Sequence, residues 1–356
     1  MTKLPQTMQG VVLTGHGGLE RLQWRDDLPV PQPGPGEVLI RVGASAVNNT
    51  DINTRTGWYS KSVRGDTASG ASGGHGAAAD KDGSWTNSPL AFPRIQGADC
   101  CGRIVAVGQG VSVERVGQRV LVRAVQAPDG PGLRIATFGS EQDGGFAEFT
   151  VAADHDAVAV RSGWSDVELA SFPCAFSTAE GMIQRSGLGA ERVLITGASG
   201  GVGSAAIQLA RRRGATVTAL TSPSKADALR ALDAHTILDR DEPVPQRAFD
   251  LVLDLVGGPR WPELLDGLRD GGRYATAGAI AGPIVELDLR TLYLRDLSLF
   301  GCTHQPPNVF TDLVGYIEAQ EIRPVVAAVY PLRDLAAAQE AFLTKSHVGK
   351  IGIAVA

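Results

Sequence analysis

Short apolar runs separated by turn residues occupy the first 150 positions of the chain. Such runs stand at 38–42, 102–107, 119–122 and 146–151. The first of them follows a cluster of proline and glycine, and the second leads directly into further glycines. Strands of this length between turn signals are typical of an all-β unit. The pattern therefore predicts a compact, barrel-like β-rich domain.

The pattern changes at about residue 192, where predicted strands begin to alternate with helical stretches. The strands are predicted at 193–196, 216–220, 236–238, 251–255, 273–276 and 297–300. Helices are predicted at 205–213, 226–232 and 334–342, and a last strand at 349–355. This alternation is typical of βαβ units, so we expect an α/β protein with a doubly wound parallel sheet. A connecting helix is predicted after Ser165, because Glu168 completes a capping box.

Residues from about 60 to 90 interrupt the strand rhythm. Serine, glycine, alanine and aspartate dominate from Arg64 to Gly83, with few apolar side chains to bury. This composition predicts a flexible surface insertion. A loop of this length is either functional, for instance a lid, or disordered. We expect Trp85 and Phe92 to dock its end onto the body, and the insertion to flank the substrate entrance.

Length and charge narrow the class of protein. The 356 residues predict about two domains, and 43% of them are hydrophobic. The longest apolar runs are too short for a transmembrane helix, and the N-terminus shows no secretory signal. The net charge of −5, without a basic stripe, argues against nucleic-acid binding. Four irregularly spaced cysteines favour a reduced, cytoplasmic protein.

The strongest chemical signal is a glycine-rich turn at 196–203, between a predicted strand and a predicted helix. Glycines let the backbone approach a pyrophosphate, and the following helix N-terminus offers free N–H groups. Gly200 and Gly203 hold two positions of the dinucleotide fingerprint, while Ala198 replaces the first glycine. The alternative is a tight strand–helix turn that binds no ligand.

The end of the second strand of this part indicates which dinucleotide is bound. Enzymes that use NAD place an acidic residue there for the ribose 2′-hydroxyl. This chain has Leu220-Thr221-Ser222 instead, followed by Lys225. A hydroxyl and an ammonium suit a 2′-phosphate, so the sequence favours NADP(H). Ser222 also has the alternative role of an N-cap before Pro223, and the two roles are compatible.

Several separated motifs resemble one family of enzymes. They are Pro33-Gly34-Pro35-Gly36-Glu37-Val38, the Asn48–Tyr59 segment of form N-x-x-D…R-x-G-x-Y, the 93–108 segment, Ala198–Gly203, and His347-Val348-Gly349-Lys350-Ile351. Together they resemble the medium-chain dehydrogenase/reductase superfamily. Within it, the chain looks closest to the zinc-free quinone oxidoreductases related to zeta-crystallin.

The resemblance implies a division of the chain. Residues 1–160 would form a GroES-like catalytic domain, 161–305 a Rossmann domain that binds NADP, and 306–356 a C-terminal return to the catalytic domain. The nicotinamide would lie in the cleft between them, and homodimers would pair through the strand at 297–300.

Zinc-dependent relatives in this superfamily hold the metal with two cysteines and a histidine. The corresponding positions here are Asn48, Ala98 and Cys174, so a single thiol remains. A catalytic zinc needs three protein ligands, and we expect no metal. His75 and His155 are expected to face solvent, and Cys174 to be a pocket or core thiol.

The same resemblance places the catalytic candidates Asn48, Asp51 and Tyr59 on the substrate side of the nicotinamide. The Asn48 amide would donate to the acceptor oxygen, and Tyr59 would donate its phenolic proton or cover the ring. Asp51 has an equally plausible alternative role, in which it orients backbone or Arg55. The cofactor-binding candidates are Thr178, Ser199, Gly200, Gly201, Val202, Gly203, Ser222, Lys225, Gly278 and Cys302.

One of these candidates, and two further residues near the predicted strand ends, have competing explanations. Thr178 has the alternative role of an interior cap. Asp254, which ends a predicted strand, either faces the cofactor edge or caps a turn, and Arg240 either reaches the adenine or is a surface charge.

Three functions remain in competition. The first is an NADPH-dependent reductase that passes a hydride to a small quinone or α,β-unsaturated carbonyl without a metal. The others are an enzyme resembling alcohol dehydrogenases and a binding protein for NADPH with little turnover.

Overall fold

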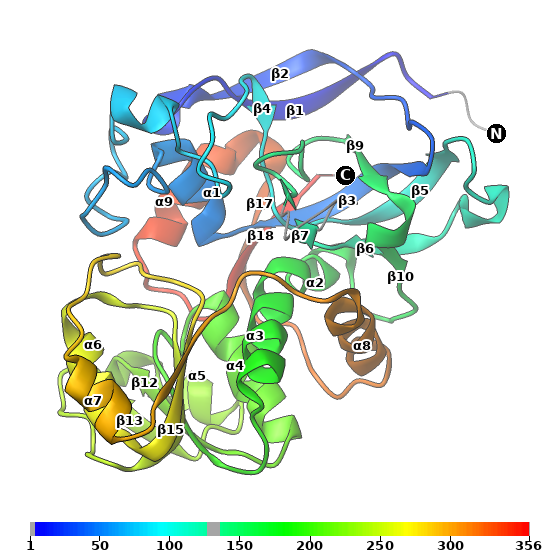
Figure 1. Ribbon diagram of the computed structural model, residues 1–356. Helices are drawn as coiled ribbons and strands as arrows, with labels where there is room; N and C mark the ends of the chain where they lie inside the picture. Colours follow the sequence, from blue (N-terminus) through cyan, green and yellow to red (C-terminus); the bar gives the residue numbers. More distant parts are fainter. Residues whose placement is uncertain (1–3, 127–135, 356) are drawn as a thin grey trace.

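A computed structural model describes residues 4–126 and 136–355 of the chain. It divides into a β-rich domain and a domain with a parallel sheet (Figure 1). The last strands of the chain, red in Figure 1, lie among the blue strands of the β-rich domain. Both ends of the chain therefore build the same domain, as the predicted C-terminal return requires.

The β-rich domain contains a sheet of order β10-β6-β5-β3-β18-β17, with β9 also paired to β3. Its strands are β3 (Glu37–Val47), β5 (Cys101–Val107), β6 (Arg119–Val122), β9 (Phe149–Ala153), β10 (Ala157–Ala159), β17 (Val326–Pro331) and β18 (Lys350–Ala354). Strand β18 pairs antiparallel with β3, with Ile351 opposite Val47. The predicted β-rich unit is confirmed, and β18 closes it from the far end of the chain.

Smaller sheets cover this core. Strands β1 (Thr7–Leu13), β2 (Leu22–Pro29) and β4 (Arg94–Ile95) form one sheet, and β7 (Val125–Gln126) pairs with β8 (Ala136–Thr137). Single turns of 3-10 helix stand at η1 (Leu19–Arg21), η2 (Ala77–Asp80), η3 (Val113–Arg115) and η4 (Asp154–Asp156). Helix α1 (Asn49–Thr56) follows β3 directly, so it brings the Asn48 segment to the edge that faces the other domain.

The second domain is built on a parallel sheet of order β13-β12-β11-β14-β15-β16. Its strands are β11 (Arg192–Ile195), β12 (Thr216–Thr221), β13 (Thr236–Asp239), β14 (Phe249–Asp254), β15 (Leu268–Thr276) and β16 (Ser298–Gly301). Val193 and Ile195 join the apolar cluster on one face, whereas Leu194 between them joins the cluster on the other. Successive side chains of a strand point to opposite faces, so both faces are covered, and the predicted doubly wound fold is confirmed.

Helices on both faces complete this domain. They are α3 (Pro173–Ser186), α4 (Gly201–Arg212), α5 (Ala226–Arg230), α6 (Trp261–Asp266), α7 (Leu289–Leu294) and α8 (Pro307–Glu318), with η5 (Pro223–Lys225) and η6 (Gly258–Arg260). The β-rich domain receives η7 (Leu332–Asp334) and α9 (Leu335–Leu343). None of the helices in the described part of the chain is both long and apolar enough to cross a membrane.

The connection between the domains follows the predicted capping box. The Ser165 N–H donates to the Glu168 carboxylate at 2.8 Å, and helix α2 (Asp166–Leu169) begins there. On the return, Phe310 and Leu313 of α8 join the apolar cluster of the parallel-sheet domain. The proposed boundary at residue 305 therefore precedes a helix that still packs on the Rossmann domain, and the return strand β17 begins at Val326.

The insertion at 60–90 differs from the expected flexible loop, because its backbone is hydrogen-bonded to the body. The His75 N–H donates to the Thr56 carbonyl at 2.9 Å, and the Trp58 indole donates to the Gly65 carbonyl at 3.0 Å. The Trp85 indole donates to the Thr50 hydroxyl at 2.7 Å. These contacts are hydrogen bonds, so the small number of apolar side chains in the insertion did not predict them.

Candidate active site

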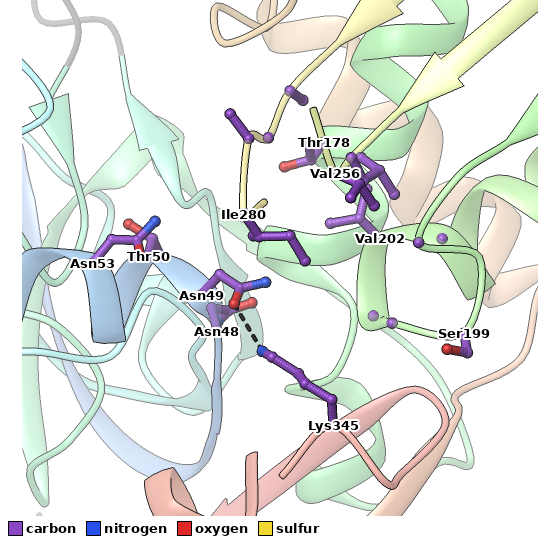
Figure 2. Close-up of a pocket in the computed structure, with 18 of the residues that line it drawn as sticks. Asn48, Asn49, Thr50, Asn53, Thr178, Ser199, Val202, Val256, Ile280 and Lys345 are labelled. Atoms are coloured by element: carbon purple, nitrogen blue, oxygen red, sulfur yellow. Dashed lines mark hydrogen bonds between the residues drawn. The ribbon is translucent and has the colours of Figure 1, made fainter. Parts of the chain in front are cut away.

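A cleft of about 590 Å³ lies between the two domains, at the carboxyl ends of the parallel strands. Each of these strands contributes a lining residue just beyond its end; they are Gly197, Ser222, Arg240, Leu255, Ala277 and Cys302. Ligands of open α/β sheets bind at this edge. The opposite wall comes from α1 and the insertion, and Figure 2 shows Asn48, Asn49 and Thr50 facing Val202 and Val256.

The glycine-rich turn connects β11 to α4 and forms the floor of the cleft. Gly197 has a φ of +57°, and a Cβ at Gly203 would lie 2.3 Å from the Gly197 carbonyl oxygen. The first turn of α4 begins after Gly200, which supplies no side-chain cap. Helix N-termini without a cap have free N–H groups that bind anions. All five candidates from this turn, Ser199 to Gly203, line the cleft.

Polar and cationic groups surround the end of β12. Ser222 precedes η5 but makes no side-chain cap hydrogen bond, so the predicted capping role is not realised by its hydroxyl. The Lys225 ammonium donates to the Ser199 hydroxyl at 3.4 Å and to the Lys345 carbonyl. Burial, and secondarily Arg240, lowers the pKa of Lys225. These groups meet beside the turn, where an anionic ligand would relieve their repulsion.

A second cationic segment enters the cleft from the loop between α9 and β18. The Lys345 ammonium donates to the Asn49 side-chain oxygen at 3.0 Å, as the dashed line in Figure 2 shows. Desolvation inside the cleft, and then Lys225, lowers the Lys345 pKa to about 8. Burial, and then Lys345, lowers the His347 pKa to about 4. No sequence motif predicts a role for Lys345, although it stands two residues before the motif that begins at His347.

Asn48 lies in the wall of the cleft, but its amide group is occupied. Its Nδ2 donates to Asp99 Oδ2 at 2.7 Å and to the Ala46 carbonyl at 3.2 Å. Its Oδ1 accepts a hydrogen bond from the Lys350 ammonium. An amide whose two hydrogens are both engaged has none left for an acceptor oxygen. The arrangement therefore makes Asn48 a fixed polar surface rather than a free donor.

Lys350 and Asp99 form a buried ion pair behind Asn48. Nζ lies 2.8 Å from Asp99 Oδ2, and the two side chains are 3% and 0% exposed. The other carboxylate oxygen of Asp99 accepts from the Cys174 N–H at 2.7 Å. The stem of Lys350 runs beside the glycine-rich turn, since a Cβ at Gly201 would lie 2.6 Å from its Cδ. This pair thus connects the wall at Asn48 to the glycine-rich turn.

Asp51 lies beneath the wall and faces backbone. Its carboxylate accepts from the Asn48 N–H at 2.7 Å and from the N–H groups of Gly97 and Ala98 at 3.3 Å each. Burial raises its pKa to about 7, although these N–H groups oppose the shift. Arg55 donates elsewhere, to the Gly17 carbonyl and the Gln339 side chain. Asp51 therefore orients the backbone of the candidate wall and shares no hydrogen bond with Arg55.

Tyr59 lines the cleft within a group of aromatic rings. Its ring meets those of Trp58 and Trp85 edge to face, with centroids 5.7 and 5.6 Å apart. Its hydroxyl donates to Thr50 Oγ1 at 3.2 Å, and Trp85 donates to the same oxygen. Burial raises the Tyr59 pKa well above its ordinary value. The phenol therefore keeps its proton at neutral pH.

The remaining candidates stand around the inner end of the cleft. Thr178, Gly278 and Cys302 all line it, and Thr178 also donates to the Cys174 carbonyl at 2.7 Å, as an interior cap does. A Cβ at Gly278 would lie 2.8 Å from the Leu255 carbonyl oxygen, which explains the glycine. Asp254 accepts from the Val256 N–H at 3.0 Å and from Gly257, so it caps the turn after β14.

Known proteins are similar to this chain over nearly its whole length. A family model described as "Alcohol dehydrogenase GroES-like domain" matches residues 34–162, and one described as "Zinc-binding dehydrogenase" matches residues 201–352. Acryloyl-coenzyme A reductase of Sulfurisphaera tokodaii is 28% identical over 97% of this chain and 99% of its own length. The quinone oxidoreductase of Lama guanicoe is 28% identical over 94% of this chain and 93% of its own.

A solved structure is also similar to this chain over nearly its whole length. The structure titled as a putative alcohol dehydrogenase from Sinorhizobium meliloti 1021 is 43% identical, with a TM-score of 0.88. It covers 99% of this chain, which covers 98% of it in turn. The chain belongs to the medium-chain dehydrogenase/reductase superfamily, in its quinone oxidoreductase-like branch. As a member of the superfamily it is an oxidoreductase, and the expected pair of GroES-like and Rossmann domains is confirmed.

One of the two family models is described as zinc-binding, but the side chains of this chain lack the donors for that metal. The ligand positions hold Asn48, Ala98 and Cys174, and burial raises the pKa of the Cys174 thiol. The Lys350 ammonium is hydrogen-bonded to Asn48, so a dication there would be repelled by a fixed positive charge. Within residues 4–126 and 136–355, no group of three His, Cys, Asp or Glu side chains is placed to hold a metal. These residues do not fit a catalytic zinc.

Proposed function

We propose that this chain is an NADPH-dependent reductase that transfers a hydride to a quinone or an α,β-unsaturated carbonyl compound without a metal. The observation that carries the proposal is the set of residues that line the cleft. One end of the cleft is lined by a glycine-rich turn with cations around it. The other end is lined by aromatic rings and by Asn48, which is hydrogen-bonded to the Lys350 ammonium and stands at a ligand position of the zinc-dependent relatives. The related acryloyl-coenzyme A and quinone reductases support an acceptor with a conjugated carbonyl.

The preference for NADPH is supported by the groups at the end of β12. Ser222 and Lys225 line the cleft there, and Lys345 approaches from the other domain. A 2′-phosphate would gain charge-assisted hydrogen bonds from both lysines. It would also replace the contact between the Lys225 ammonium and the Lys345 carbonyl. With NADH the two ammonium groups would keep their mutual repulsion.

Bound nicotinamide supplies the hydride, and the residues of this chain supply position and charge. Thr178, Gly278 and Cys302 border the inner end of the cleft, where they would hold the nicotinamide ring. Tyr59 keeps its proton, and its O–H, which donates to Thr50 Oγ1 here, would turn from Thr50 to an acceptor oxygen. Asn48 presents a rigid amide fixed by Asp99. Holding two reactants in line supplies much of the rate enhancement of such a transfer.

Asp51 acts in this proposal as a positioning residue. It is a buried residue of α1 and is not part of the cleft surface. Its carboxylate holds the N–H of Asn48 and the backbone at Gly97 and Ala98, which are neighbours of Asp99. Removing it would therefore loosen both partners of Lys350.

A homodimer is part of the proposal, formed through the edge strand β16. Leu299 on this strand is partly exposed, and α7 beside it exposes Leu289, Tyr293 and Leu294. Exposed apolar patches of this kind mark interaction surfaces. An open strand edge also offers unpaired backbone groups to a second copy.

The test is NADPH oxidation followed at 340 nm with a panel of quinones and enones. We expect turnover with NADPH to exceed turnover with NADH, and Tyr59→Phe to lower kcat without changing the KM for NADPH. Activity with alcohols and NAD⁺ alone, and with no member of the panel, would overturn the proposal.

A further inference from the structure

The insertion at 60–90 crosses the cleft and contacts the other domain. The Thr67 N–H donates to the Ile280 carbonyl at 3.0 Å, and the Thr67 hydroxyl approaches the same oxygen at 3.4 Å. Thr67 is 6% exposed, so this contact is shielded from water. It joins the catalytic domain to the Rossmann domain on the acceptor side of the cleft.

Ile280 is itself part of the cleft and is held in place by its own loop. The Ala281 N–H donates to the Val256 carbonyl at 2.9 Å, and the Gly282 N–H donates to the Ala279 carbonyl at 3.0 Å. Figure 2 shows the Ile280 side chain between Asn49 and the residues of the parallel-sheet domain. The Ile280 loop on one side and the insertion on the other therefore close this part of the cleft entrance.

The insertion is anchored at both of its ends beside the same helix. The Trp58 indole donates to Gly65 inside the insertion, and the Trp85 indole donates to Thr50 on α1. The two indoles flank the Tyr59 ring. Trp58 and Tyr59 before the insertion and Trp85 within it thus form one wall of aromatic rings, which suits a flat acceptor.

Charge on this side of the cleft argues against a long polyanionic acceptor. Lys225, Arg240 and Arg260 line the cofactor end of the cleft, and Lys345 extends from there to Asn49. Lys350 lies behind Asn48, where Asp99 neutralises its charge. The insertion itself is neutral, because Lys61, Arg64 and Lys81 are matched by Asp66, Asp80 and Asp82. A coenzyme A thioester carries several phosphate charges, which bind where basic side chains are in excess.

We propose that the insertion restricts this enzyme to compact, flat, uncharged acceptors, namely free enones and quinones, and excludes coenzyme A thioesters. The inference rests on the proposed function and adds the acceptor class. The contact between Thr67 and Ile280 blocks the part of the cleft entrance through which the pantetheine arm of a coenzyme A thioester would pass. The Trp58, Tyr59 and Trp85 rings hold the conjugated plane of the acceptor.

The experiment compares but-3-en-2-one and 1,4-benzoquinone with acryloyl-coenzyme A, using NADPH oxidation by the full-length enzyme. We expect kcat/KM for the free acceptors to exceed that for the thioester by about 100-fold, a ratio within reach of pocket contacts. Thr67→Pro, which removes the bridging N–H, should narrow this ratio by about tenfold. The KM for NADPH should not change.

Two further variants keep the result interpretable. Replacing residues 61–84 by a short Gly-Ser linker removes the contact that closes the cleft entrance. Trp85→Ala removes one of the three aromatic rings while the insertion stays in place. Lys81→Ala, an exposed change on the same insertion, is the matched control and should behave as the wild type. Should the shortened chain fail to fold, Thr67→Pro and Trp85→Ala still decide.

Equal efficiency of the wild-type enzyme with acryloyl-coenzyme A and the free enone would overturn this inference alone. The same holds for a ratio unchanged in a folded Thr67→Pro or shortened variant. If none of the three acceptors oxidises NADPH, the proposed function itself fails.

Discussion

The buried pair of Lys350 and Asp99 makes a quantitative prediction about stability. Lys350→Met keeps the apolar stem against Gly201 but leaves the Asp99 carboxylate without an opposite charge. Breaking a buried ion pair in this way costs about 3–5 kcal/mol. Asp99 keeps hydrogen bonds from Asn48 and Cys174. We therefore expect a loss of about 3 kcal/mol, the lower end of that range.

The second step of this experiment adds Asp99→Asn to the same chain. The amide removes the unpaired charge while one oxygen still accepts from the Cys174 N–H. The double variant should therefore regain stability relative to Lys350→Met, with a coupling energy of about 2 kcal/mol. Denaturant midpoints, multiplied by the slope of the unfolding transition, give the free-energy differences.

The matched control is an ion pair on the surface. Arg230 and Asp227 lie 2.7 Å apart with side chains 60% and 99% exposed. Arg230→Met should cost at most about 0.5 kcal/mol, because exposed pairs are screened by water. The reasoning is refuted if Lys350→Met costs no more than this control, or if the two changes at Lys350 and Asp99 simply add.

Four further outcomes are expected. Tyr59→Phe should lower kcat about 100-fold if its proton is used in the reaction, whereas pH profiles of the wild type should show no Tyr59 ionisation near neutrality; a normal kcat in the variant would remove Tyr59 from the chemistry. Asp51 has a folded-state pKa of about 7, above the unfolded value of about 3.9. The free energy of unfolding should therefore fall as the pH rises between these values, by at most about 1.4 kcal/mol per pH unit. Asp51→Asn should flatten this dependence of stability on pH, measured by thermal unfolding. Because the Lys345 pKa is lowered to about 8, the KM for NADPH should rise above that pH and the KM for NADH should not, and Lys345→Met should abolish the difference. Leu294→Glu on α7 should shift the protein from dimer to monomer in analytical ultracentrifugation, and a wild-type monomer would contradict the proposed use of this surface.

The parallel-sheet domain could be predicted well because its signals are local. The strand at 193–196 is β11 within one residue, and the capping box at Ser165 begins a helix as expected. Strands buried on both faces are continuous apolar runs, and caps and turns involve neighbours in the sequence. The cofactor candidates from Ser199 to Gly203 follow from the same local pattern.

Helices α8 and α1 were not predicted from the sequence. Helix α8 was missed, although Val309, Phe310, Leu313, Val314 and Ile317 are buried at helical spacing. Helix α1 is nearly all polar in sequence yet buried, so its composition concealed it. The surrounding backbone and the Asp51 carboxylate stabilise it, and such tertiary contacts override propensity.

The hydrogen bonds of the candidate wall at Asn48 join residues that are distant in the sequence. Lys350 lies 251 positions from Asp99 and 302 from Asn48. No pattern of spacing joins such residues, so the sequence indicated an available Asn48 amide where the fold occupies it. The contact between Thr67 and Ile280 spans 213 positions and is likewise invisible in a single sequence.

The central claim is that hydride transfer in this chain needs NADPH and no metal. The most direct measurement is the kcat for a free enone with NADPH, determined together with the zinc content of the same sample before and after chelation. The account predicts an unchanged kcat in protein that contains far less than one zinc per chain. A kcat that falls with the zinc content and returns when zinc is added would contradict it.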